Sequence, residues 1–377
     1  MPMHLDLQLL KERYSQDLGA FNSLAVFNNP EFNASDYSHI NAINQKAYPE
    51  IAKIKNYCAK FMLELVHAEE DASVLATSGS SEAIMLTLSN LKQEYQDECN
   101  IIVSESSHIS WSHIAKVIGV SLNRVPIGAD GKICIDSVAN VIDDQTKLVV
   151  ATLGSPTTLM FDAVSELDLM LNNYNDIGLH VDAAIGGFVA PFIETKPWDF
   201  RLDNVMSMNV SVHKYGIVQP GLGYLICRKS LYTSKYNYFG GDSSHESIRF
   251  SYGFMPLLQF YFNIMMLGIS GYRDIVRGHY DNAYHIHEIM KDYFNLDLPI
   301  SNHEQLPGLL YENDNNSLYE KLLSKGWNIP KYKKPGTSNQ VFRLVFKYGL
   351  NIEKLFSFLS DNENDQSKLF QYECNVS

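Results

Sequence analysis

Residues 178–184 read GLHVDAA and residues 205–216 read VMSMNVSVHKYG, and these two stretches decide the fold. Each begins as a short, mostly apolar run of the kind that forms a buried strand. Three similar runs are IIVS (101–104), LVVATL (148–153) and GYLICR (223–228). Apolar strands that alternate with helical stretches are typical of a largely parallel sheet with helices on both faces. The sequence therefore predicts an α/β fold.

Helical periodicity lies on either side of this alternation. Residues 48–68 place apolar side chains on one helical face, and Pro49 near their start suits a first helical turn. A long apolar helix is expected at 255–290 and a strand at 340–346. We expect an N-terminal wrapping segment (1–50), a large domain (51–275) and a small C-terminal α+β domain (276–377).

Composition narrows the class of ligand. The net charge is −13 and no run of Lys or Arg occurs, which argues against nucleic acid or an anionic membrane as the main partner. No apolar stretch approaches the roughly 20 residues of a membrane span, and no export signal is visible at the N-terminus. The five cysteines are scattered without metal-ligand spacing, which fits a reducing cytoplasm and predicts no metal site. A small metabolite is the expected ligand.

The stretch TSGSSEAIMLTLSNL (77–91) is a turn of small residues that leads into an apolar helix. Gly79, Ser80 and Ser81 are placed to offer backbone N–H groups and hydroxyls to an anion such as phosphate at the start of that helix. A Ser followed by Glu is also an ordinary capping box, so this stretch alone leaves both interpretations open.

Asp182 and Lys214 follow two of the predicted strands. A buried Asp needs a cationic or donor partner, such as a protonated pyridine nitrogen, although an isolated Asp at a strand end also caps helices. A lysine in apolar surroundings has a lowered pKa and forms a Schiff base with an aldehyde, whereas most lysines are solvated charges. Together, a phosphate cradle, an acid and an amine meet the three recognition needs of pyridoxal 5′-phosphate.

Several segments in order, from TSGSSEA through HVDAAIGGFVAPF, NVSVHKYG, YFGG and RFSYGF, closely resemble the pyridoxal-phosphate-dependent (group II) amino-acid decarboxylases. The chain is most similar to glutamate decarboxylase and to archaeal tyrosine/aspartate decarboxylases, over about residues 40–350. The resemblance implies the aspartate-aminotransferase-type fold (fold type I), a mostly parallel seven-stranded sheet and a homodimer with active sites at the subunit interface.

The resemblance also implies roles for single residues. Lys214 holds the aldehyde and Asp182 the ring nitrogen, while Ala184 and His108 pack on the two faces of the ring. Residues expected at the cofactor are Gly79, Ser80, Ser81, Ser155, Ser211 and His213, with Phe250 and Ser251 from the neighbouring subunit. Tyr238 (also from that subunit), His108 and Lys214 are the candidates for the proton donor to Cα. Tyr238 is the favoured one, and the alternative is that it only packs in a surface loop. Arg343 is expected to bind the substrate α-carboxylate, and Val26, Phe27 and Asn44 to contact the substrate.

The chain departs from the glutamate enzymes at several of these positions. His108 stands where bacterial glutamate decarboxylases carry Gln, and the family's Gly-Thr-Thr turn reads Gly154-Ser155-Pro156, so that Ser155 or Thr157 would have to replace a threonine hydroxyl. Val26 and Asn44 stand where the glutamate enzymes have the Thr and Asp that contact the distal carboxylate. Loss of one hydrogen bond to a buried carboxylate costs about 1–3 kcal/mol, so we expect that glutamate is not the best substrate.

The sequence thus predicts a cytoplasmic, homodimeric L-amino-acid α-decarboxylase that releases CO2 and a primary amine. The alternatives are a decarboxylation coupled to oxidative deamination, which gives an aldehyde, another lyase or a transaminase reaction on the same cofactor, and a non-catalytic paralogue.

Overall fold

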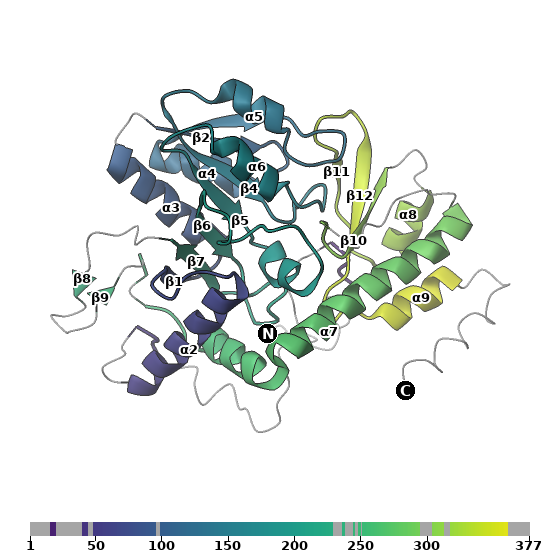
Figure 1. Ribbon diagram of the computed structural model, residues 1–377. Helices are drawn as coiled ribbons and strands as arrows, with labels where there is room; N and C mark the ends of the chain where they lie inside the picture. The colour runs from purple at the N-terminus through teal and green to yellow at the C-terminus, as the bar shows by residue number, and fades with distance from the viewer. Residues whose placement is uncertain are drawn as a thin grey trace, which may run out of the picture.

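The computed structural model describes residues 16–19, 40–43, 48–95, 99–228, 236–237, 244–245, 248–249, 251–294, 304–312 and 317–360. Within these ranges the chain forms two main sheets, and in Figure 1 both lie on the same side of the long helix α7, the larger sheet toward its N-terminal end and the smaller toward its C-terminal end. A short hairpin of β8 (Tyr236–Asn237) and β9 (Ser244–His245) lies apart from both.

The larger sheet has seven strands in the order β1-β7-β6-β5-β4-β2-β3. Its strands are β1 (Ser73–Thr77), β2 (Asn100–Ser104), β3 (Ser121–Val125), β4 (Thr146–Thr152), β5 (Gly178–Asp182), β6 (Val205–Val210) and β7 (Gly223–Cys227). Strands β3, β2, β4, β5 and β6 run parallel, whereas β7 is antiparallel to both β6 and β1. The predicted α/β class and the mostly parallel seven-stranded sheet are confirmed.

Helices cover both faces of this sheet, which is why its central strands are mostly apolar on both sides. One face packs on α3 (Ser80–Tyr95) and α4 (Ser110–Ile118), where Ile84 and Trp111 lie fully buried against Ile101 and Val150. The other face is covered by the elements α2 (Pro49–Leu65), α5 (Ile135–Val141), α6 (Val164–Leu171), η2 (Gly186–Phe188), η3 (Ala190–Phe192) and α7 (Met255–Phe294).

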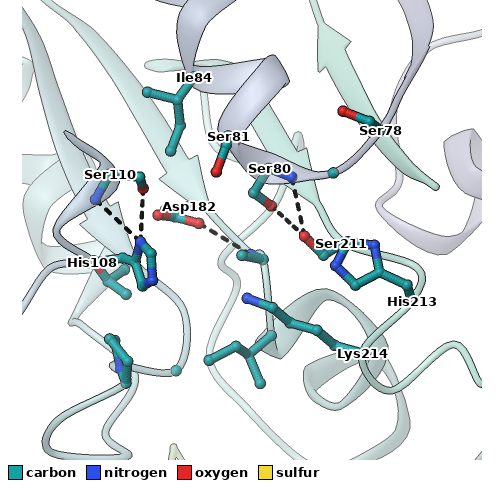
Figure 2. A pocket seen from close by; sticks show the side chains of 16 residues that line it. Ser78, Ser80, Ser81, Ile84, His108, Ser110, Asp182, Ser211, His213 and Lys214 are labelled. Atoms are coloured by element: carbon teal, nitrogen blue, oxygen red, sulfur yellow. Dashed lines mark hydrogen bonds between the residues drawn. The ribbon is translucent and has the colours of Figure 1, made fainter. Parts of the chain in front are cut away.

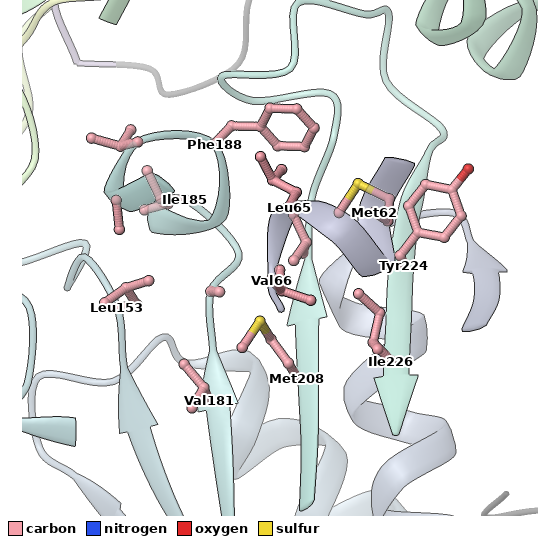
Figure 3. Packing of buried hydrophobic residues seen from close by; sticks show 14 of the residues in the cluster. Met62, Leu65, Val66, Leu153, Val181, Ile185, Phe188, Met208, Tyr224 and Ile226 are labelled. Carbon is pink, nitrogen blue, oxygen red and sulfur yellow. The ribbon is translucent and has the colours of Figure 1, made fainter. Parts of the chain in front are cut away.

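The core on this second face is the larger one. Figure 3 shows Leu65 of α2 beside Phe188 and Met62 of α2 beside Tyr224 of β7, with Val66 next to Met208 of β6. Burial of each such side chain is worth roughly 1.5–3 kcal/mol, so this layer contributes much of the driving force for folding.

The smaller sheet is antiparallel and has the order β10-β12-β11, with β10 (Gly308–Glu312), β11 (Lys331–Lys333) and β12 (Gln340–Val345). It packs with α8 (Ser317–Ser324), α9 (Ile352–Ser360) and the C-terminal half of α7 around a separate apolar core. Leu18 belongs to this core, because its backbone hydrogen-bonds to Asn328 and Val345. The predicted domain limits at 50 and 275 stay predictions.

In the described part of the chain, no helix is long and apolar enough to cross a membrane. The same residues contain no group of three His, Cys, Asp or Glu side chains arranged to hold a metal ion.

Candidate active site

A cavity of about 440 Å³ opens where β4, β5 and β6 end and α3 begins (Figure 2). Carboxyl ends of neighbouring parallel strands meet at one sheet edge, where α/β folds bind their ligands. The cavity is lined by Ser78, Gly79, Ser80, Ser81, Ile84, His108, Ser110, Thr152, Gly154, Pro156, Asp182, Ala184, Ile185, Ser211, His213 and Lys214. Nine of the residues predicted for the site are therefore brought together: Gly79, Ser80, Ser81, His108, Asp182, Ala184, Ser211, His213 and Lys214.

Asp182 ends β5 and is 3% exposed. Its Oδ2 accepts a hydrogen bond from the indole Nε1 of Trp111 at 2.7 Å. Its Oδ1 accepts two, from the side-chain amide of Asn209 at 2.7 Å and from the backbone N–H of Ala184 at 3.1 Å. Three donors hold the buried carboxyl group as an acceptor, which satisfies the requirement that a buried charge be paired.

Lys214 lies in the loop after β6, and Figure 2 shows its ammonium group directed into the cavity, across from Asp182. Burial lowers the pKa of Lys214 to about 8, although the charge of Asp182 acts in the opposite direction and that of Arg343 adds to the lowering. Near neutral pH a far larger fraction of this amine is unprotonated than of an ordinary lysine, so it is a nucleophile.

The N-terminus of α3 forms a second wall of the cavity, next to the loop that carries Lys214. Both the backbone N–H and the hydroxyl of Ser80 contact Ser211 Oγ, at 3.1 and 2.7 Å. Gly79 precedes them with φ of +149°, and a Cβ built on it would lie 2.7 Å from Cε1 of His213. Only glycine lets the turn, the helix start and His213 approach so closely.

His213 and His108 also line the cavity, and they differ in whether Nδ1 donates or accepts a hydrogen bond. The Nδ1–H of His213 donates to the carbonyl of Leu222 at 3.0 Å, and its pKa is lowered by burial and by nearby Lys214. His108 accepts at Nδ1 from the backbone N–H of Ser110 at 3.2 Å, so its neutral ring carries the proton on Nε2. Its pKa is also lowered, by burial and then by Lys214.

Arg343 of β12 reaches the rim of the cavity from the smaller sheet. Its guanidinium donates to the carbonyls of Pro156, a cavity residue, and of Gly19, the latter at 2.7 Å. The same loop is fixed by Ser155, whose hydroxyl donates to the carbonyl of Ser106 at 3.0 Å. Ser155 and Arg343 are thus not among the residues that line the cavity, although Arg343 touches one that is.

The remaining predicted residues divide into two groups. Ser251 is exposed, does not line the cavity of its own chain and accepts a hydrogen bond from Asn41 at 3.2 Å. The other five lie outside the described residues: Val26, Phe27, Asn44, Tyr238 and Phe250.

Sequence reasoning missed Trp111 and Asn209, which donate directly to Asp182. A signal for Asn209 exists, because a polar side chain in a mostly buried strand such as β6 requires a buried partner. Trp111 gave no such signal, since an apolar ring on a helix facing a sheet is ordinary core packing.

Comparison with known proteins gives a consistent answer. The family model described as pyridoxal-dependent decarboxylase conserved domain matches residues 35–307. The glutamate decarboxylase of Lactococcus lactis subsp. cremoris (strain MG1363) is 31% identical over an alignment of 359 residues, which covers 85% of this chain and 76% of that protein.

Solved structures agree. The glutamate decarboxylase of Lactobacillus brevis superposes with a TM-score of 0.83 at 29% identity, covering 95% of this chain and 92% of that one. An L-methionine decarboxylase from a Streptomyces species superposes with a TM-score of 0.75 at 16% identity, covering 94% and 92%, and shares the fold.

Proposed function

The chain belongs to the pyridoxal-dependent decarboxylase family, a family of fold type I carboxy-lyases that use pyridoxal 5′-phosphate, and we propose that it is an L-amino-acid α-decarboxylase whose best substrate is not glutamate. One observation carries the proposal. A single cavity joins a lysine of low pKa, a buried carboxylate and a helix N-terminus rich in hydroxyls. The cofactor presents an aldehyde, a ring nitrogen and a phosphate, which need these three groups.

The cavity fits this cofactor in two further respects. Gly79 leaves the α3 N-terminus without a Cβ at the point of closest approach, where backbone N–H groups and the hydroxyls of Ser80, Ser81 and Ser211 would bind the phosphate. Thr152 lines the cavity, and its buried hydroxyl has no hydrogen-bond partner among the described residues, so a ligand atom would satisfy it.

Bound pyridoxal phosphate supplies an electron sink for the electron pair left on Cα when CO2 departs. Lys214 provides the unprotonated amine that binds the aldehyde, and Asp182 keeps the ring nitrogen protonated by offering it a fixed carboxylate. Ala184, two residues after the end of β5, would lie against one face of the pyridine ring, and His108 would lie against the other face.

His213 would donate a hydrogen bond to the phosphate only when its imidazole is protonated. Because its Nδ1–H is committed to the carbonyl of Leu222, it has a second proton to donate from Nε2 only in the charged form. A phosphate beside it would favour that form and raise its pKa, against the effect of burial.

Arg343 is the proposed binder of the substrate α-carboxylate. Its planar guanidinium forms paired hydrogen bonds, which would fix the orientation of the bond to be broken. In the structure these donors contact the carbonyls of Pro156 and Gly19, which hold the guanidinium at the cavity rim. Ser155 is proposed to act through the same loop, by anchoring it to Ser106.

The side chain of the substrate is proposed from three residues outside the described part of the chain. Val26 lacks the hydroxyl and Asn44 the charge found in the glutamate enzymes, and Phe27 beside Val26 adds apolar surface. Incubation of the purified protein with cofactor and a panel of amino acids, with detection of CO2, amine and aldehyde by mass spectrometry, tests substrate and reaction together. We expect amine and CO2 from an amino acid other than glutamate. The highest kcat/KM for glutamate would contradict the substrate proposal, and aldehyde as the main product would contradict the reaction.

We also propose that the protein is a cytoplasmic homodimer whose sites are shared between subunits. Ser251 is exposed and lies outside its own cavity, which supports a role in the partner's site for Phe250, Ser251 and Tyr238, with Tyr238 as the proton donor to Cα.

A further inference from the structure

A buried polar cluster lies behind Asp182 on one face of the larger sheet. His180 and Asp182 point to the same side of β5, and the parallel register places them opposite Ser207 and Asn209 of β6. His180 and Asn209 are fully buried, and Ser207 and Asp182 are 3% exposed. The intervening residues Val181 and Met208 face the apolar core on the opposite side.

These four side chains form a continuous row of hydrogen bonds. Asn209 Nδ2 donates to Asp182 Oδ1 at 2.7 Å, and His180 Nε2 lies 2.7 Å from Asn209 Oδ1. His180 Nδ1 in turn lies 2.7 Å from Ser207 Oγ. The row leads from the cavity wall into the protein interior.

The direction of each bond follows from the first one. An ionised carboxylate only accepts, so the amide nitrogen of Asn209 faces Asp182 and its oxygen faces His180. His180 must then carry a proton on Nε2. Burial lowers the pKa of His180, which favours the neutral ring, and the neutral ring accepts at Nδ1 from the hydroxyl of Ser207.

Trp111 fixes the other side of the carboxylate. Its Nε1–H donates to Asp182 Oδ2, and its ring packs edge-on against His180 with centroids 5.2 Å apart. Each carboxylate oxygen has two acceptor positions. Asn209 and Ala184 fill both positions of Oδ1, and Trp111 fills one of Oδ2, so one position remains, on Oδ2.

We infer that His180 and Asn209 are positioning residues that act through Asp182, by fixing the carboxylate so that its last acceptor position faces the cavity and receives the proton of a ring nitrogen. The inference rests on the proposed function. This positioning role accounts for a row of polar side chains in a strand pair that is otherwise apolar. It differs from a packing role because it requires a hydrogen-bond donor at the place of His180 Nε2, not only a side chain of the right shape.

A matched pair of variants separates the positioning role of His180 from a packing role. His180→Phe keeps a flat ring against Trp111 but removes the Nε2 donor, which leaves the buried Oδ1 of Asn209 without its partner, so that the amide that donates to Asp182 is no longer held in place. In His180→Gln the side-chain amide donates from about the place of Nε2. The readouts are the dissociation constant of pyridoxal phosphate for the apoprotein, and the NMR chemical shift of isotope-labelled ring nitrogen in the bound cofactor.

For His180→Phe we expect roughly tenfold weaker cofactor binding, the effect of one weakened hydrogen bond to a charged group, and a ring-nitrogen shift toward the deprotonated form. His180→Gln should restore both. If His180→Phe does not fold, Ser207→Ala provides the test, with a smaller shift in the same direction. Wild-type values in the folded variants would overturn the inference while leaving the proposed function intact. A wild-type protein that binds no cofactor would overturn both.

Discussion

At the scale of single residues, the reactivity of Lys214 depends on a pKa that its surroundings lower. Its pKa of about 8 lies below the ordinary value of 10.5, so the neutral amine predominates as the pH rises above about 8. We predict that in the cofactor-free protein the rate of reductive methylation of Lys214 by formaldehyde, followed by peptide mass spectrometry, rises with pH, is half-maximal near that value and levels off above it. Exposed lysines in the same digest provide the reference.

Asp182→Asn supplies the control for this prediction. The charge of Asp182 raises the pKa of Lys214, so its removal should move the midpoint of the methylation profile to lower pH. A midpoint that stays in place, or moves up, would show that the carboxylate does not act on the amine.

The sequence indicated most of the residues that line the cavity, since Lys214, Asp182 and Ser80 each follow a strand or begin a helix. What it could not indicate are the contacts that fix Asp182. Trp111 lies 71 positions away from Asp182 in the sequence, and only packing of α4 onto the sheet makes the indole a donor to the carboxylate. Hydrogen bonds between residues so far apart depend on the tertiary fold.

At the scale of elements, the start of α3 is the part of the site where the backbone packs most closely against a side chain, at Gly79 and His213. Gly79→Ala introduces a Cβ within 2.7 Å of His213, in a backbone conformation that side chains rarely adopt. We predict a loss of stability of about 1–3 kcal/mol in denaturant unfolding, together with weaker binding of pyridoxal phosphate.

Gly278→Ala is the matched control, because a Cβ at that position of α7 meets nothing within 4 Å. It should leave cofactor affinity unchanged and stability equal or slightly higher. Equal cofactor affinity in the two variants would mean that the close approach at Gly79 has no part in binding.

The sequence predicted β2, β4, β5, β6 and β7 from their apolar runs but not β1 or β3. Both missed strands lie at the edges of the sheet, and β3 (SLNRV) buries only Val125. Edge strands need no second apolar face, so they lack the pattern that marks a central strand. The change of backbone direction at Gly268 inside α7 was also not predicted, and no residue pattern announced it.

At the scale of the whole molecule, we propose a division into a wrapping segment (1–50), a large domain (51–275) and a small domain (276–377). Its support is that two separate apolar cores meet along α7. The site depends on both, since Arg343 of β12 contacts Pro156 of the cavity rim and Tyr332 of β11 donates to the carbonyl of Thr157 at 2.7 Å.

Shared sites in a dimer lead to a prediction of complementation. Lys214→Ala and Ser251→Glu should each inactivate the homodimer, the first through the amine and the second through repulsion of the partner's phosphate. Mixed under conditions that exchange subunits, the two variants should regain part of the activity, because one site of each heterodimer is then intact. If mixing restores nothing although heterodimers form, Ser251 acts on its own chain.

We propose that Lys214 is the covalent anchor of pyridoxal phosphate in this cavity. Borohydride reduction of the protein with bound cofactor, followed by peptide mapping by mass spectrometry, tests it most directly. We expect one pyridoxyl-modified residue, Lys214, and no modification at that site in Lys214→Ala. A stable adduct on a different lysine, or none on a protein saturated with cofactor, would contradict it.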